Sequence, residues 1–286
     1  MRILVTGARG FTGHHFVQAA EAAGHRVTAL TADLRDAAAL QREIGAAEPE
    51  AVVHLAAISF VGHADAADFY DVNVIGTLNL LDGLAALPKV PRSVLLASSA
   101  NVYGNAEQSP ISEMQPPAPV NHYAMSKLAM EHMARTYVDK LPLFFARPFN
   151  YTGPGQDESF IIPKLVAHFA RRAPAVELGN LDVEREFNDV RFVCEAYLRL
   201  LQDAAPGEVY NICTGKPLTL RSVIDLLKRM TGHELQINVN PKFVRNNEIK
   251  TLCGDPTKLI EAIGEISLPP LEETIRNMLN HASRGK

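Results

Sequence analysis

Tyr123 and Lys127 stand four positions apart in the segment NHYAMSK, near the start of an expected helix. In a helix this spacing puts both side chains on one face, within reach of the same ligand. A free tyrosine has a pKa of about 10, and a nearby lysine ammonium favours its phenolate form. Such a tyrosine can donate or accept a proton at a carbonyl carbon that exchanges a hydride. The spacing alone also fits a solvent-exposed pair on a helix surface, so other motifs are needed to distinguish a catalytic pair from an exposed one.

A hydroxyl group with suitable chemistry follows an apolar run. The run Ser93–Ser98 predicts a strand buried on both faces, and Ser99 comes directly after it. A hydroxyl at the carboxyl end of a strand can hydrogen-bond a substrate carbonyl and polarise it, although serines there also satisfy local backbone groups. Ser99 followed by Tyr123 and Lys127 is a far more specific pattern than any of its parts.

The N-terminal segment MRILVTGARGFTG runs from an apolar strand into a helix. Gly7, Gly10 and Gly13 are spaced for a tight turn, a close backbone approach to phosphate, and close packing of helix on strand. Free N–H groups at the helix start, together with the helix dipole, favour a pyrophosphate there. The turn therefore predicts a nicotinamide dinucleotide cofactor.

The choice between NAD and NADP depends on the end of the second strand. NAD-binding folds usually carry an acid there for the ribose hydroxyls, but the residue in that place is Thr31. Arg9, inside the turn, is able to reach a 2′-phosphate, although an exposed, solvated arginine fits equally well. Asp33 follows closely and is a candidate for the adenine amino group. The pattern leaves NAD open and slightly favours NADP.

The elements that must position these groups alternate as in a parallel sheet covered by helices. The expected strands are Arg2–Thr6, Arg26–Leu30, Ala51–Leu55, Ser93–Ser98 and Leu143–Arg147. The expected helices cover residues 11–23, 36–46, 66–87 and 121–139. The fold class is therefore α/β, a Rossmann-type doubly wound parallel sheet with a smaller C-terminal substrate-binding region.

After Phe149 the regular alternation ends in a cluster of proline and glycine. We expect a dinucleotide-binding domain over 1–150 and a second, smaller region over 151–286 that covers the carboxyl edge of the sheet. Within the latter, residues 190–213 are expected to return to the main sheet as a helix and a strand. Because ligands of open α/β sheets bind at the carboxyl ends of the strands, the active site is expected between the two parts.

Composition excludes several other classes of protein. The chain has 286 residues, a formal charge of −4 and three widely spaced cysteines, which indicates neither a nucleic-acid partner, nor a membrane surface, nor a metal site. No apolar run approaches the ~20 residues of a membrane helix. Because Met1 leads almost directly into a strand, we expect no signal peptide and a cytoplasmic protein.

Together, these motifs resemble the extended short-chain dehydrogenase/reductase family over nearly the whole chain. The matching segments are TGARGFTG at 6–13, HLAA at 54–57, NVIGTLNLL at 73–81, SSANVYG at 98–104, YAMSK at 123–127 and ARPFNYTGPGQ at 146–156. The resemblance implies a catalytic triad of Ser99, Tyr123 and Lys127, with Asn73 helping to hold the lysine through water. The expected cofactor-binding residues are Gly7, Arg9, Gly10, Phe11, Thr12, Gly13, Asp33, Leu34, Leu55, Ala56, Ala57, Asn73, Tyr123, Lys127 and Pro148.

The second half of the chain narrows the resemblance to particular members of the family. LGNLDVEREFNDVR at 178–191 and RNNE at 245–248 are similar to segments of GDP-mannose 4,6-dehydratases and GDP-4-keto-6-deoxy-mannose reductases. The resemblance implies Arg185 and Arg245 on a diphosphate and Glu248 on the nucleotide ribose, in keeping with the geometry of those groups. Asn246 replaces a proline of the family pattern. The expected substrate-binding residues are Ser99, Asn150, Leu178, Asn180, Arg185, Arg245 and Glu248.

The two residues that follow Ser99 help to distinguish between the possible reactions. Resembling dehydratases carry Asp-Glu or Ser-Glu there, whereas this chain has Ala100 and Asn101. Neither side chain is an acid or a base, so elimination of water is poorly supported. Reduction of a 4-keto sugar and 4-epimerisation with a retained cofactor both need only the Ser–Tyr–Lys set. The second half favours the reductase, and a non-catalytic NAD(P) sensor is the remaining alternative.

Helices 66–87 and 119–140 carry apolar stripes. These stripes can pack against the helices' own sheet, but the resembling enzymes use the two helices to dimerise. We therefore expect a homodimer.

Overall fold

A six-stranded, fully parallel sheet forms the centre of the computed structural model, which describes residues 1–59, 65–241, 249–267 and 269–284. Its strands lie in the order β10-β5-β4-β3-β1-β2. They are β1 (Arg2–Thr6), β2 (Arg26–Ala29), β3 (Ala51–His54), β4 (Ser93–Ala97), β5 (Leu143–Pro148) and β10 (Val209–Ile212). The parallel α/β architecture predicted from the sequence is confirmed, with strand ends within a residue or two of those expected.

The chain reverses direction across the sheet between β1 and β3. From β1 it moves outward to β2, which forms one edge, and then crosses back over β1 to β3. Ligands of doubly wound sheets bind in the crevice at such a switch point, at the carboxyl ends of the strands. The glycine-rich turn follows β1 and the Leu55–Ala57 segment follows β3, so both lie at this crevice.

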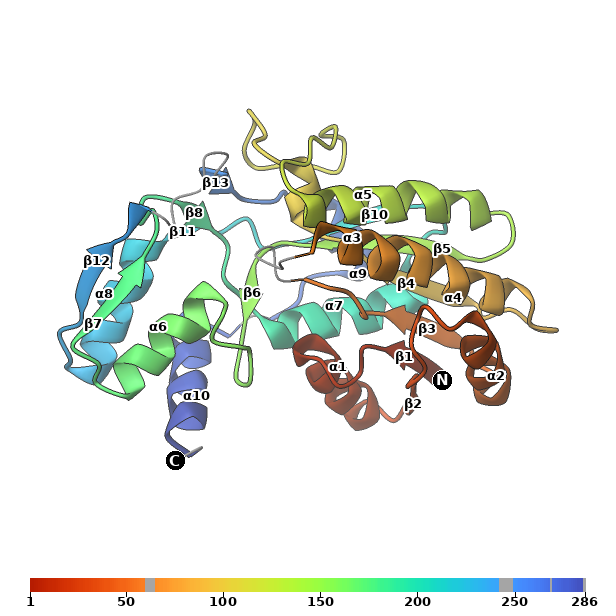
Figure 1. Cartoon of the computed structure of the whole chain (residues 1–286), viewed down its shortest axis with the longest axis horizontal. Coiled ribbons are helices and arrows are strands. Elements are labelled where there is room, and N and C mark those ends of the chain that lie inside the picture. Colours follow the sequence, from red (N-terminus) through yellow and green to blue (C-terminus); the bar gives the residue numbers. More distant parts are fainter. Residues whose placement is uncertain (60–64, 242–248, 268, 285–286) are drawn as a thin grey trace.

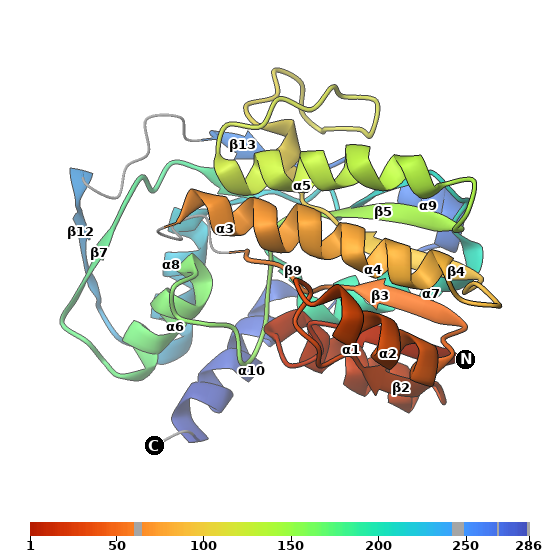
Figure 2. The same cartoon turned by 45° about the vertical axis from the view of Figure 1, so that its right-hand side comes forward.

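Helices cover both faces of the sheet because the strand residues alternate in direction. On one face, Ile3, Val5 and Leu95 pack under α1 (Phe11–Ala22), α7 (Val190–Asp203) and α9 (Thr257–Ile263). On the other face, Leu4, Val52 and Leu96 pack under α2 (Ala37–Ala47), α4 (Gly76–Ala85) and α5 (His122–Ala134). Figures 1 and 2 show α4 and α5 running side by side over this second face.

The helix expected over 66–87 contains a π-helical turn. It consists of α3 (Ala66–Tyr70), the π turn Asp71–Ile75 and α4. Single π turns in helices are rare and frequently mark functional sites. The turn has Asn73 at its centre, and its side chain enters the site described below.

A second, smaller group of elements has its own core. It consists of α6 (Ile161–Ala170), α8 (Leu220–Thr231), α10 (Leu271–Arg284) and the parallel pair β7 (Ala175–Leu178) and β12 (Gln236–Val239). Figure 1 shows these elements beside the main sheet, at the end where its strands finish. Short strands link the two parts: β6 (Tyr151–Thr152) pairs with β9 (Asn188–Asp189), and β8 (Glu184–Arg185) lies between β11 (Leu218–Thr219) and β13 (Thr251–Leu252).

Glu186 fastens the second group to the main sheet. Its side chain is fully buried and accepts the backbone N–H groups of Thr214, at 2.6 Å, and Gly254, at 2.7 Å. It also accepts from the amide of Asn188 at 3.0 Å. A buried carboxylate needs such donors, so this residue fixes the segment after β8 against the end of β10.

Candidate active site

The glycine-rich turn has the geometry of a phosphate cradle. Gly7 has a φ of 69°, and a Cβ at this position would lie 2.7 Å from the backbone nitrogen of Ala56. A Cβ at Gly13 would lie 2.1 Å from the carbonyl oxygen of Gly7. Helix α1 begins after Gly10 with no side chain of the described residues capping its N–H groups. These free donors, at the positive end of the helix dipole, fit a dinucleotide diphosphate.

Tyr151, which the sequence reading did not single out, covers one side of this turn. Its hydroxyl lies 2.7 Å from the hydroxyl of Thr12, and its ring stacks on Phe11 with centroids 6.1 Å apart. Both partners are expected cofactor residues. Tyr151 belongs to β6, at the start of the second region, so the cofactor crevice is bounded from both parts of the molecule.

The segment after β2 has its acids already engaged. Glu43 of α2 accepts from the backbone nitrogen and the hydroxyl of Thr31, each at 2.8 Å. Asp33 pairs with Arg35 at 2.7 Å, and the guanidinium lowers the pKa of Asp33 to about 2. Arg9 is exposed and bonds to none of the described side chains or backbone groups.

Ser99 and Tyr123 meet at the end of β4. Asn121 caps α5 through its side chain, accepting from Ala124 N at 2.9 Å, which places Tyr123 in the first turn. The Tyr123 side chain is buried, which raises the pKa of its phenol, and a hydrogen bond with Ser99 opposes that rise.

Asn101 sets the direction of the Ser99 hydroxyl. Its backbone N–H and its side-chain amide both donate to Ser99 Oγ, each at 3.2 Å. A hydroxyl oxygen has two acceptor lone pairs, so the O–H of Ser99 remains as a donor toward the Tyr123 oxygen. The sequence marks Asn101 only as a residue that is neither an acid nor a base, and the fold shows that its amide points back to Ser99.

Lys127 lies one turn after Tyr123, with both on the same face of α5. Its Nζ donates to the carbonyl oxygen of Ala97 at 2.7 Å. Burial lowers the pKa of Lys127 to about 8, while the carboxylate of Glu131 acts in the opposite direction. Tyr123, Lys127 and Ser99 are thus brought together as the sequence suggested.

Asn73 contacts the catalytic helix through Ser126 rather than through Lys127. Its amide nitrogen donates to Ser126 Oγ at 3.0 Å, and Ser126 donates to the carbonyl of Tyr123 at 2.8 Å. The side-chain carbonyl oxygen of Asn73 accepts a hydrogen bond from Ile58 N at 2.9 Å. The side chain therefore ties the segment after β3 to the start of α5.

His54 adds a buried, uncharged link below the crevice. Thr77 Oγ1 donates to the carbonyl of Asn73, so it must accept from His54 Nε2, at 2.8 Å. His54 Nδ1 is then an acceptor and receives the hydroxyl of Thr6 at 2.7 Å. Burial, followed by the charge of Lys127, lowers the pKa of His54 to about 3. The imidazole is neutral at physiological pH, with its proton on Nε2.

The expected substrate residues are more scattered. Arg185 donates to the backbone carbonyls of Glu184, Lys250 and Ile249, so its guanidinium holds the segment that follows Glu248. Arg245 and Glu248 lie outside the described residues.

The remaining expected substrate and cofactor residues have mainly structural contacts. Leu178 is buried at the end of β7, and Asn180 caps the nitrogen of Asp182 at 2.9 Å. Asn150 is exposed and accepts from Asn188 N at 3.0 Å through its carbonyl. Pro148 ends β5, and Leu34 is buried against the second face of the sheet.

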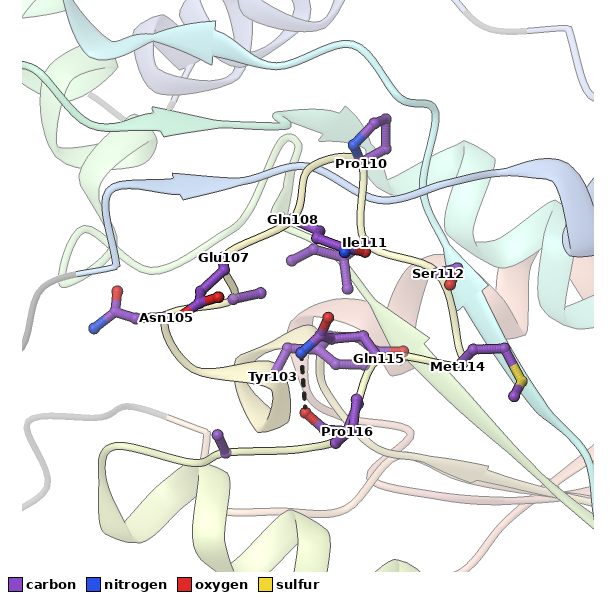
Figure 3. A pocket seen from close by; sticks show the side chains of 12 residues that line it. Tyr103, Asn105, Glu107, Gln108, Pro110, Ile111, Ser112, Met114, Gln115 and Pro116 are labelled. Atoms are coloured by element: carbon purple, nitrogen blue, oxygen red, sulfur yellow. Dashed lines mark hydrogen bonds between the residues drawn. The ribbon is translucent and has the colours of Figure 1, made fainter.

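A hollow of about 470 Å³ lies under the loop that follows Tyr103 (Figure 3). Its lining includes Tyr103, Glu107 and Met114 but none of the three catalytic candidates. The same loop covers the edge strand β10, because Glu113 accepts from Asn211 N at 2.7 Å. Within the described residues, no group of His, Cys, Asp and Glu side chains could hold a metal ion, and no helix is long and apolar enough to span a membrane.

The family model described as "NAD dependent epimerase/dehydratase family" matches residues 3–213. The chain belongs to this family. It is 38% identical to GDP-6-deoxy-D-talose 4-dehydrogenase of Aggregatibacter actinomycetemcomitans, over 92% of each chain. It is 36% identical to GDP-6-deoxy-D-mannose reductase of Pseudomonas aeruginosa, over 98% of this chain and 96% of the relative.

Among solved structures, the fold is similar to "RMD from Pseudomonas aeruginosa complexed with NADPH". The TM-score is 0.92 at 33% sequence identity, and the match covers all of both chains. The family resemblance and the Rossmann-type fold inferred from the sequence are therefore confirmed, and the protein is an NAD(P)-dependent enzyme of the extended short-chain dehydrogenase/reductase type.

Proposed function

We propose that this protein reduces the 4-keto group of a nucleotide-diphosphate 4-keto-6-deoxy sugar, with GDP as the favoured nucleotide, using NAD(P)H. The observation that carries the proposal is the meeting of Ser99, Tyr123 and Lys127 beside an uncapped glycine turn. The two relatives named above support it, since 6-deoxymannose and 6-deoxytalose differ only in configuration at C4.

The residues present fit the cofactor and divide the work of the reaction. When bound, the reduced nicotinamide supplies the hydride. Tyr123 donates its proton to the former carbonyl oxygen, and Ser99 turns its O–H from Tyr123 to that oxygen to orient it. Lys127, as an ammonium, stabilises the resulting phenolate. Burial of Tyr123 raises the pKa of its phenol, so Lys127 has to offset that effect.

Asn101 supports reduction rather than elimination. A 4,6-dehydratase must move protons on neighbouring sugar carbons and needs an acid and a base for that purpose. At this place the chain has an amide that donates to Ser99 and Ala100, which is buried and apolar. The arrangement serves hydride transfer at a single carbon.

For the cofactor, we propose NADPH over NADH. The acids after β2 are held by Thr31 and Arg35, which leaves neither free for a ribose diol. Arg9 stands exposed in the turn as a partner for a 2′-phosphate. The similar structure solved with NADPH supports this choice.

For the organisation, we propose a cofactor domain over 1–150 and a nucleotide-sugar-binding region over 151–286, with 190–213 returning to the sheet. Pairing of β10 with β5 supports the return. We further propose that Asn73 acts on Lys127 through water, that Arg185, Arg245 and Glu248 contact the nucleotide, and that the protein is a homodimer.

The experiment incubates purified protein with GDP-4-keto-6-deoxy-mannose and NADPH or NADH, and follows the absorbance of the reduced cofactor. Stoichiometric loss of reduced cofactor, with a GDP-6-deoxyhexose identified by NMR, is the expected result. Interconversion of C4 epimers without net cofactor consumption would instead establish the 4-epimerase. Cofactor binding without turnover of any nucleotide sugar would establish a sensor.

A further inference from the structure

A buried ion pair lies directly behind the catalytic lysine. Arg147 of β5 donates to Glu131 of α5 through two nitrogens, at 2.9 and 2.6 Å. The two side chains are only 5% and 2% exposed. The guanidinium also lies 4.9 Å from the centre of the Tyr103 ring. Pairs as deeply buried as this one are costly to desolvate and require good geometry to persist.

Glu131 has a second partner just after the carboxyl end of β4. The hydroxyl of Ser98 donates to Glu131 Oε1 at 2.5 Å. Ser98 is the residue before Ser99, and Ala97, one residue earlier, accepts from Lys127 Nζ. One carboxylate therefore holds the short stretch of backbone that presents both the catalytic hydroxyl and the carbonyl that anchors the lysine.

The spacing along α5 places Glu131 on the catalytic face. Tyr123, Lys127 and Glu131 follow one another at intervals of four residues, and side chains four apart on a helix are neighbours. The sequence therefore contains the signal YxxxKxxxE, which extends the YxxxK pattern by one helical turn.

The charges around Lys127 give Glu131 a second role. From β3, Lys127 faces His54, which is neutral; from β4 it faces the Ala97 carbonyl and the serine hydroxyls; on its own helix it faces Tyr123 and Glu131. From β5 the nearby charged group is Arg147, which is bound by Glu131. Of the two charged groups, Glu131 favours the ammonium form of Lys127 and Arg147 opposes it.

We propose that Glu131 is a positioning residue of this active site: its buried carboxylate fixes the Ser98–Ser99 end of β4 and places a negative charge one helical turn from Lys127. The inference rests on the proposed function, because it assigns Glu131 an effect through the catalytic lysine. Arg147 holds the carboxylate in place and prevents it from turning toward Lys127 as a direct ion pair.

The test compares the pH dependence of kcat/KM in wild type, Glu131→Gln and Glu131→Asp. Without the carboxylate, Lys127 loses its proton at lower pH. The alkaline limb of the profile should then move down by about one pH unit or more, with the loss of rate greatest at high pH. Glu131→Asp keeps the charge and should restore the limb. Glu195→Gln, which removes a carboxylate paired with Arg199 on α7, is the matched control and should leave the profile unchanged.

An unchanged alkaline limb in Glu131→Gln, or an equal shift in Glu195→Gln, would overturn the proposal. Because Glu131→Gln leaves Arg147 buried with a weaker partner, the double variant Glu131→Gln/Arg147→Met removes both charges together. Because this variant also loses the repulsion between Arg147 and Lys127, its limb should lie between those of Glu131→Gln and wild type, and a limb at or above the wild-type position would count against the proposal.

A readout without catalysis separates this inference from the proposed function. If wild type turns over no 4-keto sugar, the proposed function fails. The ionisation of Lys127 can still be followed through the pH dependence of NADPH binding, measured by fluorescence, with Lys127→Met as the baseline. A transition moved to lower pH in Glu131→Gln supports the role of Glu131, and an unmoved transition refutes it.

Discussion

At the scale of single residues, the chemistry depends on which hydrogen atoms are free to move. Two N–H groups of Asn101 point at Ser99 Oγ, so the Ser99 hydroxyl acts as a donor. The phenol oxygen of Tyr123 accepts this hydrogen bond, and the side chain of Lys127 lies one helical turn away. His54, close by, is held in one neutral tautomer by Thr6 and Thr77.

Tyr123→Phe removes the proton donor and keeps the ring. We expect kcat to fall by about 10²- to 10⁴-fold, the usual contribution of general acid catalysis. The far-UV circular dichroism and the cofactor affinity should stay close to those of wild type. Near-normal turnover would contradict the assignment of Tyr123.

Asn101→Asp replaces a donor to Ser99 by an acceptor. The carboxylate would draw the Ser99 O–H away from the sugar oxygen, so we expect kcat to fall by about 100-fold, the scale of a lost oxyanion donor. Asn101→Ala retains the backbone donor and should lose less, with KM little changed in either variant. Steady-state kinetics of the pair, in which aspartate is no worse than alanine, would refute this orientation of Ser99.

At the scale of elements, the cofactor crevice depends on close approach of backbones at the switch point of the sheet. Gly7 and Gly13 have no room for a side chain because Ala56 and the Gly7 carbonyl lie too near. The π turn at Asp71–Ile75 similarly brings Asn73 between the segment after β3 and the start of α5. These positions are set by how elements pack against each other.

Gly13→Ala tests that packing. The added Cβ would lie 2.1 Å from a backbone oxygen, so we expect a loss of stability of about 1–3 kcal/mol and much weaker cofactor binding. Gly45→Ala is the control, since a Cβ there meets nothing within 4 Å on α2; it should raise stability by about 0.5–1 kcal/mol. Thermal unfolding and cofactor titration report both effects. Equal behaviour of the two variants would argue against a close-packed turn.

At the scale of the whole molecule, the two regions meet around the carboxyl ends of the strands. Glu186 and Tyr151 join them, one through buried backbone donors and the other at the glycine turn. On the face of the sheet covered by α4 and α5, the π turn before α4 exposes Ile75, at 47%, and the first turn of α5 exposes Met125, at 43%. Exposed apolar side chains on paired helices suit a second copy of the chain.

Ile75→Glu combined with Met125→Glu should convert the proposed dimer to a monomer, because the interface would then bury like charges. Size-exclusion chromatography with light scattering gives the mass directly. Val239→Glu, at an apolar side chain of β12 that is 56% exposed, should leave the mass unchanged. A monomeric wild type would disprove the dimer.

The sequence by itself determined the parallel sheet and the glycine turn, and it identified the candidate catalytic residues. Each of these is written in local patterns: buried apolar strands, glycines at fixed spacing, and Tyr123 and Lys127 one helical turn apart. Such patterns depend on a few neighbouring residues, so they can be recognised in the sequence without the tertiary structure. Family segments also pointed to enzymes of GDP-linked sugars, and the relatives found include a GDP-6-deoxy-D-talose 4-dehydrogenase and a GDP-6-deoxy-D-mannose reductase.

Only the tertiary structure decided which distant groups meet. Glu131 of α5 contacts Ser98, which follows β4, and Arg147 of β5. Tyr151 of the second region contacts Thr12 of α1. Arg185, expected to be available for a diphosphate, holds backbone carbonyls of a segment far along the chain. Contacts of this kind depend on how helices pack on the sheet, and no local spacing encodes that packing. The relative position of Tyr123 and Lys127 depends on one helix, whereas the protonation state of Lys127 depends on groups from several elements of the fold.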